Sequence, residues 1–142
     1  MPSQLYRRAE RFVGIVLERP GDADHPLIRW WHSLTTIGEQ PDSVPWCASF
    51  INGCCWDCRL PRSKSAAARS WLGIGEAVSL DEARRGYVVV LARGANPAAG
   101  HVGLYSGRVG ATIYLLGGNQ GDAVSVAPFP ASRVIGVRRV EG

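Results

Sequence analysis

The spacing of apolar residues changes at Gly75, and this change constrains the fold more than any other feature of the sequence. Before Gly75 the apolar residues recur at every third or fourth position, which is typical of amphipathic helices. After Gly75, short runs rich in Val, Ile, Leu and Tyr alternate with Gly, Pro and Asn, which is typical of strands joined by turns. Helices followed by strands predict an α+β fold, with N-terminal helices packed on a C-terminal antiparallel β-sheet.

We expect helices over residues 3–19, 25–37, 44–58 and 66–72, and strands over residues 87–92, 101–106, 111–116, 123–127 and 133–140. Ser3 is a candidate cap for the first helix, and Pro20-Gly21 is its stop. Pro45 falls in the first turn of the third helix, where its missing N–H costs nothing. Neither an internal repeat nor a linker divides the chain, so we expect one domain over residues 1–142.

Composition excludes several classes of protein. Of the 142 residues, 46% are hydrophobic, which is enough for a buried core. The net charge is +4 and the arginines are scattered, so the charge does not indicate a nucleic-acid groove. Every apolar run is too short to cross a bilayer. Arg7, Arg8, Glu10 and Arg11 stand where a signal sequence needs its apolar core, so we expect neither a signal peptide nor membrane insertion.

Cys47 is a candidate nucleophile because of its predicted place in the first turn of the helix at 44–58. Free N–H groups and the positive end of the helix dipole favour a thiolate at such a position. The alternative is that Cys47 is a small buried core residue, as many cysteines are.

The other cysteines raise the question of a metal site. Cys55 and Cys58 have the two-residue gap of a zinc half-site, but a second half-site is missing. Cys47, Cys54 and Cys58 share one helical face, which favours core packing over zinc. Since all four cysteines lie in one predicted helix, we expect free thiols.

Asp22, Asp24 and His25 raise the separate possibility of a calcium site. Two acids without the rest of a binding loop are weak evidence, and a helix cap is the simpler explanation of Asp24. We therefore expect no metal and no cofactor.

His101 is the candidate general base, since it begins a predicted strand between small residues that leave its ring room. A nucleophilic cysteine needs an imidazole within hydrogen-bond reach, and a third polar group that holds the ring. If Tyr105 pairs with Thr112, His101 faces Leu116. The polar residues just beyond Leu116 are two amides, Asn119 and Gln120, and either can accept a hydrogen bond from the ring.

Three sequence strings together resemble one enzyme family: VPWCASFING around Cys47, GHVGLYSG around His101, and LLGGNQGDAVSV around Asn119. In order and spacing they are similar to CHAP and NlpC-type cysteine peptidases and amidases that cut bacterial peptidoglycan, particularly small endolysin-like members from phages and prophages. The resemblance implies a papain-like fold in which Cys47 attacks an amide and His101 is the base. It also implies that a polar residue on the following strand orients His101.

The sequence departs from the family pattern at the third catalytic position, where Gly117 stands in place of the acid found in many members. We therefore expect Asn119 to orient His101, with Gln120 as its rival, and we expect Trp46 and Gln120 to contact substrate. A neutral amide fixes the ring but gives an imidazolium less electrostatic support than a carboxylate.

The resemblance implies bacterial peptidoglycan as the partner, and we expect a monomer that is made in the bacterial cytoplasm and acts at the cell wall after release. One alternative is a secreted antibacterial amidase effector of the same chemistry. Another is a non-catalytic cell-wall-binding module that stacks sugars on tryptophans. The candidates for stacking are Trp30, Trp31, Trp46, Trp56 and Trp71. The family resemblance leaves open whether the cleaved bond is the amidase bond or a peptide bond of the stem or cross-bridge.

Overall fold

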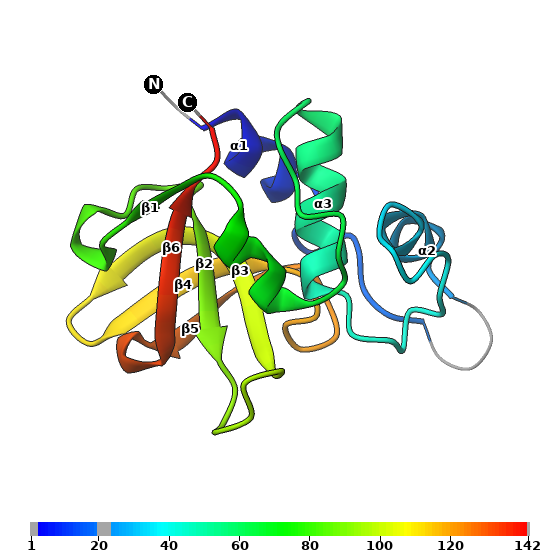
Figure 1. Ribbon diagram of the computed structural model, residues 1–142. Helices are drawn as coiled ribbons and strands as arrows, with labels where there is room; N and C mark the ends of the chain where they lie inside the picture. Colours follow the sequence, from blue (N-terminus) through cyan, green and yellow to red (C-terminus); the bar gives the residue numbers. More distant parts are fainter. Residues whose placement is uncertain (1–2, 20–23, 142) are drawn as a thin grey trace.

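The computed structural model describes residues 3–19 and 24–141, and its helices precede its strands as predicted (Figure 1). The helices are α1 (Gln4–Glu10), α2 (Pro26–Ser33) and α3 (Cys47–Asp57), with shorter 3-10 turns η1 (Ala68–Gly73), η2 (Leu80–Glu82) and η3 (Ala131–Arg133). The strands are β1 (Glu76–Val78), β2 (Val88–Ala92), β3 (Gly100–Val109), β4 (Thr112–Gly117), β5 (Ser125–Pro130) and β6 (Val134–Arg139). The predicted α+β class is confirmed.

The strands form one 6-stranded sheet in the order β1-β6-β2-β3-β4-β5, and every neighbouring pair is antiparallel. Five of these strands were expected from the sequence at nearly these bounds. The sixth, β1, was missed because its short Glu-Ala-Val stretch has no alternating pattern, and it exists only by pairing with β6 at the sheet edge.

The predicted register of the β3–β4 hairpin is wrong. Val109 pairs with Thr112 and Leu104 pairs with Leu116, so the turn lies at residues 110–111. The stretch Ser106-Gly107-Arg108 has a turn-like composition, yet it continues β3 through a bulge. This register moves His101 away from Leu116 and toward the loop that follows β4.

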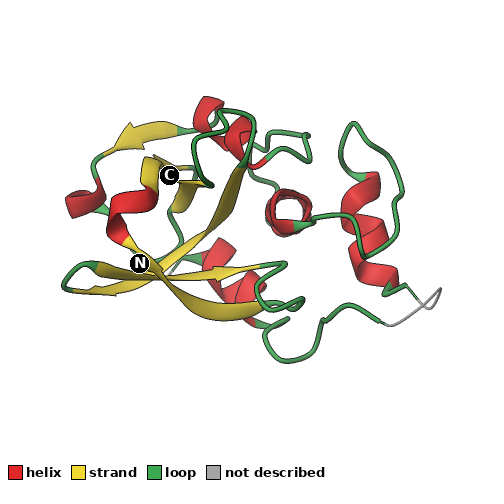
Figure 2. Ribbon diagram, turned by 90° about the horizontal axis from the view of Figure 1, so that it is seen from below, coloured by secondary structure: helices red, strands yellow, loops and turns green. Residues whose placement is uncertain are grey.

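The two faces of the sheet bury different clusters, as alternation along each strand requires. One face packs on the helices through Val88, Val90, Val102, Leu104 and Leu116. The other face gathers Val89, Leu91, Ile113, Leu115 and Val137 under its own loops. Viewed along its axis, α3 lies between the sheet and α2 (Figure 2), and every residue from Cys47 to Cys55 is buried, whereas Trp56 and Asp57 at its end are exposed.

The helix boundaries differ from the sequence prediction at two places that matter for the site. α1 is capped by Ser3 as expected, but it ends at Glu10, and the chain then turns through Gly14 at φ 75°. The predicted stop at Pro20-Gly21 lies outside the described residues. α3 begins at Cys47 rather than at residue 44, so Pro45 precedes the helix and Cys47 is its first residue.

Packing separates the tryptophans into two groups. Trp31, Trp46 and Trp71 are core residues, whereas Trp30 and Trp56 are about half exposed. Cys54 is completely buried in the core, as predicted. Cys55 is completely buried as well, whereas Cys58, which shares the predicted face, is only half-buried; all four cysteines are free thiols. In the described part of the chain, no helix has the length and apolarity needed to cross a membrane.

Candidate active site

The thiol of Cys47 lies at the start of α3, where backbone N–H groups converge on it. The backbone N–H groups of Val102 on β3, of Ala48 and of Cys47 itself lower the pKa of the thiol. Trp46 caps the helix without a side-chain hydrogen bond, so no side chain competes for these first N–H groups. Val102 directly follows His101 on β3, but no hydrogen bond joins the Cys47 thiol to the His101 ring within the described residues.

Burial decides the resting state of this thiol. Only 7% of Cys47 is exposed, and this burial raises the pKa of the thiol, although the N–H groups and the charge of Arg93 act in the opposite direction. We predicted that the helix start favours a thiolate, but the loss of hydration outweighs the helix field. The thiol is therefore neutral at rest, and its proton has to leave as the sulfur reacts.

His101 is held by one amide from the loop after β4. Nε2 of its ring lies 2.9 Å from Oε1 of Gln120. The amide nitrogen of Gln120 donates to the carbonyl oxygens of Leu115, at 3.1 Å, and Ser125, at 2.8 Å, so the amide oxygen must face the ring. An amide oxygen can only accept, and Nε2 of His101 therefore carries the proton and donates.

This tautomer leaves Nδ1 of His101 as the basic nitrogen. Nδ1 is buried and has no hydrogen-bond partner within the described residues. Burial lowers the pKa of His101 from its ordinary value of 6.5, the bond to Gln120 raises it, and the charges of Arg93 and Arg133 lower it again. The net lowering keeps the imidazole neutral near pH 7, which is the state that a general base requires.

The hydrogen bond that we expected from Asn119 is made by Gln120 instead. Asn119 sits at φ 58° and lines the cavity beside His101, and no hydrogen bond joins it to the ring in the part of the chain that the structure describes. The physical reason is the shifted β3–β4 register, which brings the loop itself, rather than Leu116, beside His101.

The glycine at position 117 favours Gln120 over Asn119 as the residue that orients His101. A Cβ atom at position 117 would lie 2.5 Å from Oε1 of Gln120, so the space of the missing side chain is taken by the Gln120 amide. The acid that the family pattern places here is thus replaced in space by a side chain from further along the loop. A glycine at an expected functional position was the clue in the sequence.

Trp46 does not line a cleft, contrary to our expectation that it contacts substrate. It is completely buried, stacks on Trp31 at 6.0 Å between ring centroids, and donates its Nε1–H to Glu18 at 3.4 Å. Its contact is with the core because α3 packs it against α2. Trp46 therefore fixes the helix start that carries Cys47. Gln120, our second candidate for substrate contact, does line the cavity.

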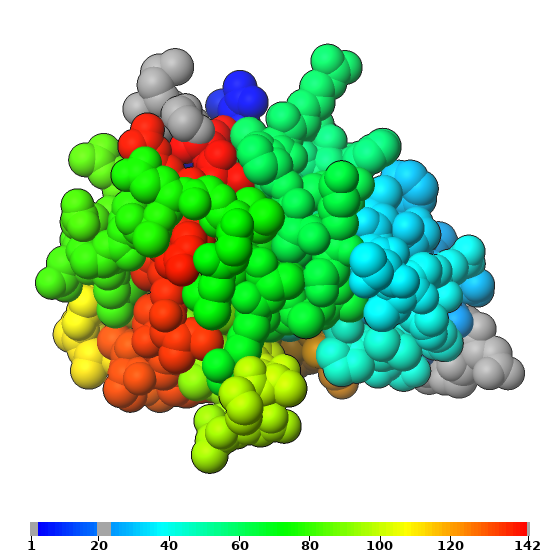
Figure 3. All heavy atoms as spheres, in the orientation of Figure 1, coloured from blue at the N-terminus to red at the C-terminus, as the bar shows by residue number. Residues whose placement is uncertain are grey.

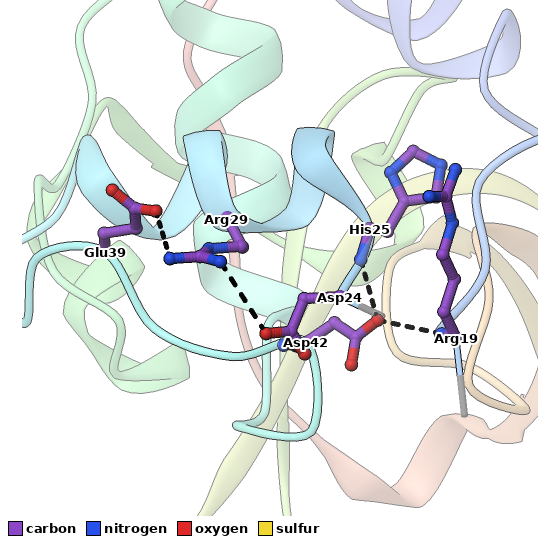
Figure 4. A network of polar contacts seen from close by, with 6 residues as sticks. All are labelled: Arg19, Asp24, His25, Arg29, Glu39 and Asp42. Atoms are coloured by element: carbon purple, nitrogen blue, oxygen red, sulfur yellow. Dashed lines mark hydrogen bonds and ion pairs between the residues drawn. The ribbon is translucent and has the colours of Figure 1, made fainter. Parts of the chain in front are cut away.

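Asp42 anchors the chain that leads into α3 (Figure 4). Its carboxylate accepts the backbone N–H of Arg19, at 2.8 Å, and of His25, at 3.0 Å. Burial alone would raise the pKa of Asp42, but these N–H bonds outweigh it and lower the pKa. Asp24 accepts from the N–H of Asp42 and faces Arg29.

The same contacts test the predicted helix cap at Asp24 and the possible calcium site. His25, not Asp24, caps α2 by accepting the N–H of Leu27. Asp24 is engaged by protein groups, and Asp22, the other acid of the possible calcium site, lies outside the described residues. The carboxylates that the structure describes here therefore act as structural anchors for the loop before α3.

A cavity of about 730 Å³ opens beside His101 on the sheet face opposite α3. It is lined by Arg93, Gly94, His101, Asn119, Gln120, Gly121, Ser125, Ala127, Pro128, Phe129 and Arg133. The ring of Phe129 lies 5.3 Å from that of His101. Sequence reasoning missed the contributions of Arg93, Phe129 and Arg133, because only strand pairing brings them to His101.

Comparison with known proteins gives evidence of fold. No family model matches the sequence, and no curated protein matches it. The structure of the peptidoglycan hydrolase RipB from Mycobacterium tuberculosis is similar, with a TM-score of 0.56 and 18% sequence identity. The match covers 98% of this chain but only 64% of the RipB chain. At this identity the likeness concerns the fold, and the protein has the papain-like α+β fold that the sequence strings implied.

Proposed function

We propose that this protein is a cysteine-dependent hydrolase that cleaves an amide bond of bacterial peptidoglycan. One observation carries the proposal: His101 donates from Nε2 to Gln120 and keeps a buried Nδ1 that has no partner among the described residues, and it stands next to Val102, whose N–H lowers the pKa of Cys47. A nucleophile, a base and an orienting group are the parts that thiol hydrolysis needs. The fold it shares with a protein named as a peptidoglycan hydrolase supports the substrate class.

The reaction is an acyl transfer in two halves. The sulfur of Cys47 attacks the amide carbonyl carbon while its proton passes to Nδ1 of His101. The N–H of Cys47 at the start of α3 stabilises the oxyanion. The C–N bond then breaks, His101 protonates the leaving nitrogen, and a thioester remains. Water attacks the thioester and gives a proton to His101, which returns it to the departing sulfur.

Gln120 takes the orienting role in this proposal. Its oxygen holds Nε2–H of His101, so Nδ1 stays the basic nitrogen through both halves of the reaction. Because Gln120 is neutral, the imidazolium gains a dipole but no opposing charge. The resting pair is therefore a neutral thiol and a neutral imidazole, with proton transfer coupled to attack.

The sequence strings favour an endolysin-like enzyme that is made in the bacterial cytoplasm and reaches the wall after release. A secreted amidase effector would use the same chemistry. A monomer suffices, since Cys47, His101 and Gln120 all come from one chain. Whether the enzyme is an amidase or an endopeptidase follows from the new amino terminus that it creates.

The test is digestion of purified sacculi, followed by mass spectrometry of the released fragments. Wild type should release soluble fragments, and Cys47→Ala should lose at least about a thousandfold in rate, because no other thiol lies at a helix start. Cys58→Ala is the matched control, since Cys58 is a half-buried thiol at the other end of α3. Equal rates for wild type and Cys47→Ala would exclude the thiol mechanism.

A wall-binding module without catalysis is the alternative that the surface supports. Trp30 and Trp56 are 46% and 50% exposed, with ring centroids 6.4 Å apart, and exposed aromatic rings of this kind can stack on sugars. In that case wild type would sediment with sacculi and release no fragments, and Trp30→Ala together with Trp56→Ala would abolish sedimentation.

A further inference from the structure

The cavity beside His101 carries positive charge from two arginines. Arg93 follows β2 directly, at the base of the loop over residues 93–99 that projects from the surface (Figure 3). Arg133 ends η3, just before β6. β2 and β6 pair with Leu91 opposite Val134, so the two arginines meet at the same end of neighbouring strands. None of the cavity's described lining residues is acidic.

Arg133 is held in place by contacts that spare its ligand-binding groups. Its Nε donates to the carbonyl oxygen of Ala92 at 3.0 Å, and its guanidinium lies 5.6 Å from the ring centroid of Phe129. Neither contact uses the terminal amino groups. A guanidinium fixed in this way loses little freedom when it binds a planar anion.

Neither arginine forms an ion pair with a described residue. In the part of the chain that the structure describes, ion pairs involve Arg8, Arg29 and Arg108, and none involves Arg93 or Arg133. Both charges lower the pKa of His101, and the charge of Arg93 also lowers that of Cys47. A group bound by Arg93 therefore lies within electrostatic reach of both reacting side chains.

We propose that Arg93 and Arg133 form a carboxylate-binding subsite that holds an acidic peptide in the cavity beside His101. This inference rests on the proposed amide hydrolysis and adds the class of substrate. Guanidinium groups bind carboxylates by charge-assisted, often bidentate hydrogen bonds. Stem peptides of peptidoglycan carry free carboxylates, and conversion of a carboxylate to a carboxamide removes the charge while nearly preserving the shape. The subsite therefore selects the unamidated peptide.

The test compares a synthetic stem tetrapeptide with forms in which each carboxylate in turn is a carboxamide. Wild type should cleave the free acid about 10- to 100-fold more efficiently, in kcat/KM, than one of the amidated forms. The difference should appear mainly in KM, because the charge contact forms when substrate binds. Arg93→Gln should reduce this preference to about threefold or less, and Arg93→Glu should reverse it.

Arg139→Gln is the matched control, because it removes the same charge from an exposed residue at the far end of β6. It should keep the wild-type preference. Arg133→Lys keeps the charge but loses the planar fork, so it should retain part of the preference. Circular dichroism establishes that each variant is folded.

A second measurement separates this inference from the proposed function. Folded Cys47→Ala protein is titrated calorimetrically with the same peptides, so binding is read without turnover. Tighter binding of the free acid that disappears with Arg93→Gln supports the subsite, even if no peptide is cleaved. Equal binding of the acid and all amidated forms overturns the subsite, even if sacculi are digested. If wild type cleaves none of the peptides while the titration still shows tighter binding of the free acid, the hydrolase proposal fails and the subsite stands.

Discussion

The two faces of the sheet give Cys47 and His101 different surroundings. On the face toward α3, Trp31, Trp46 and Phe50 pack around the helix start and leave Cys47 only 7% exposed. On the other face, His101 and Gln120 border an open cavity lined by Arg93 and Arg133, neither of which forms an ion pair within the described residues. The closed face positions the nucleophile through packing, whereas the open face orients the base and offers polar groups to a ligand. Substitutions on the two faces should therefore fail in different ways.

The largest expected difference is in stability. Trp46→Ala should lower the free energy of unfolding by about 3–5 kcal/mol, because it leaves a cavity in a fully buried stack. Phe129→Ala on the open face should cost about 1–2 kcal/mol, since Phe129 is only partly buried. Urea denaturation of both variants measures the contrast. Equal losses would mean that the open face is as much a core as the closed one.

The next difference concerns catalysis on the open face. Gln120→Ala should lower kcat about 10- to 1000-fold with KM little changed, because Gln120 fixes the tautomer of His101. Asn119→Ala should change kcat less than about threefold, since the neighbouring loop residue makes no bond to the ring in the described structure. Steady-state hydrolysis of a defined muropeptide by folded variants is the measurement. If Asn119→Ala lost its activity and Gln120→Ala kept it, Asn119 would be the residue that orients His101.

These two expectations mark the limit of sequence reasoning. Cys47 and His101 could be selected because each stands at the predicted start of an element, and local pattern predicts element starts. The sequence could not decide between Gln120 and Asn119 as the residue that orients His101, because that decision depends on the β3–β4 register. The turn-like composition of Ser106-Gly107-Arg108 predicts the wrong register. The α+β class needed only the order of periodicities.

The sequence could not predict that Arg93 and Arg133 line one cavity. They are 40 positions apart in the sequence and come together only because β2 pairs with β6, which is not its neighbour in the chain. The raised pKa of Cys47 was also missed, because the helix field is visible in the sequence while burial by distant residues is not.

The pH dependence of activity tests whether His101, on the open face, is the general base. His101 must be neutral to act as the base, and its pKa lies below the ordinary 6.5, so kcat/KM should stay high until the pH falls below 6.5. Arg93→Gln removes a charge that lowers this pKa, so the acid limb should move to higher pH. Gln120→Ala removes a bond that raises it, so the limb should move to lower pH. Movement of both limbs in the same direction would contradict the assignment of His101 as the base.

The smallest expected effect lies behind the closed face, at the carboxyl pair of Glu18 and Asp122. Burial, with the hydrogen bond and charge of Asp122 and the charge of Asp42, raises the pKa of Glu18 to about 7, while the bond from Trp46 lowers it. The folded state thus holds a proton that the unfolded chain releases near its ordinary 4.5. The stabilisation is complete below pH 4.5 and is lost as the pH rises through 7.

Glu18→Gln should remove this loss, because the amide can donate to Asp122 and accept from Trp46 at any pH. The Tm of the variant minus that of wild type should therefore increase by about 3 °C between pH 5 and pH 8, a modest shift because Glu18 is partly solvated. Glu10→Gln, at the exposed end of α1, is the control and should show no such increase. A difference in Tm that stays constant or shrinks with pH would mean that Glu18 is ionised in the folded protein. The backbone bonds from Glu18 N–H to the Asp122 carbonyl and from Val124 N–H to the Val16 carbonyl would then hold the loop after β4 without a shared carboxyl proton.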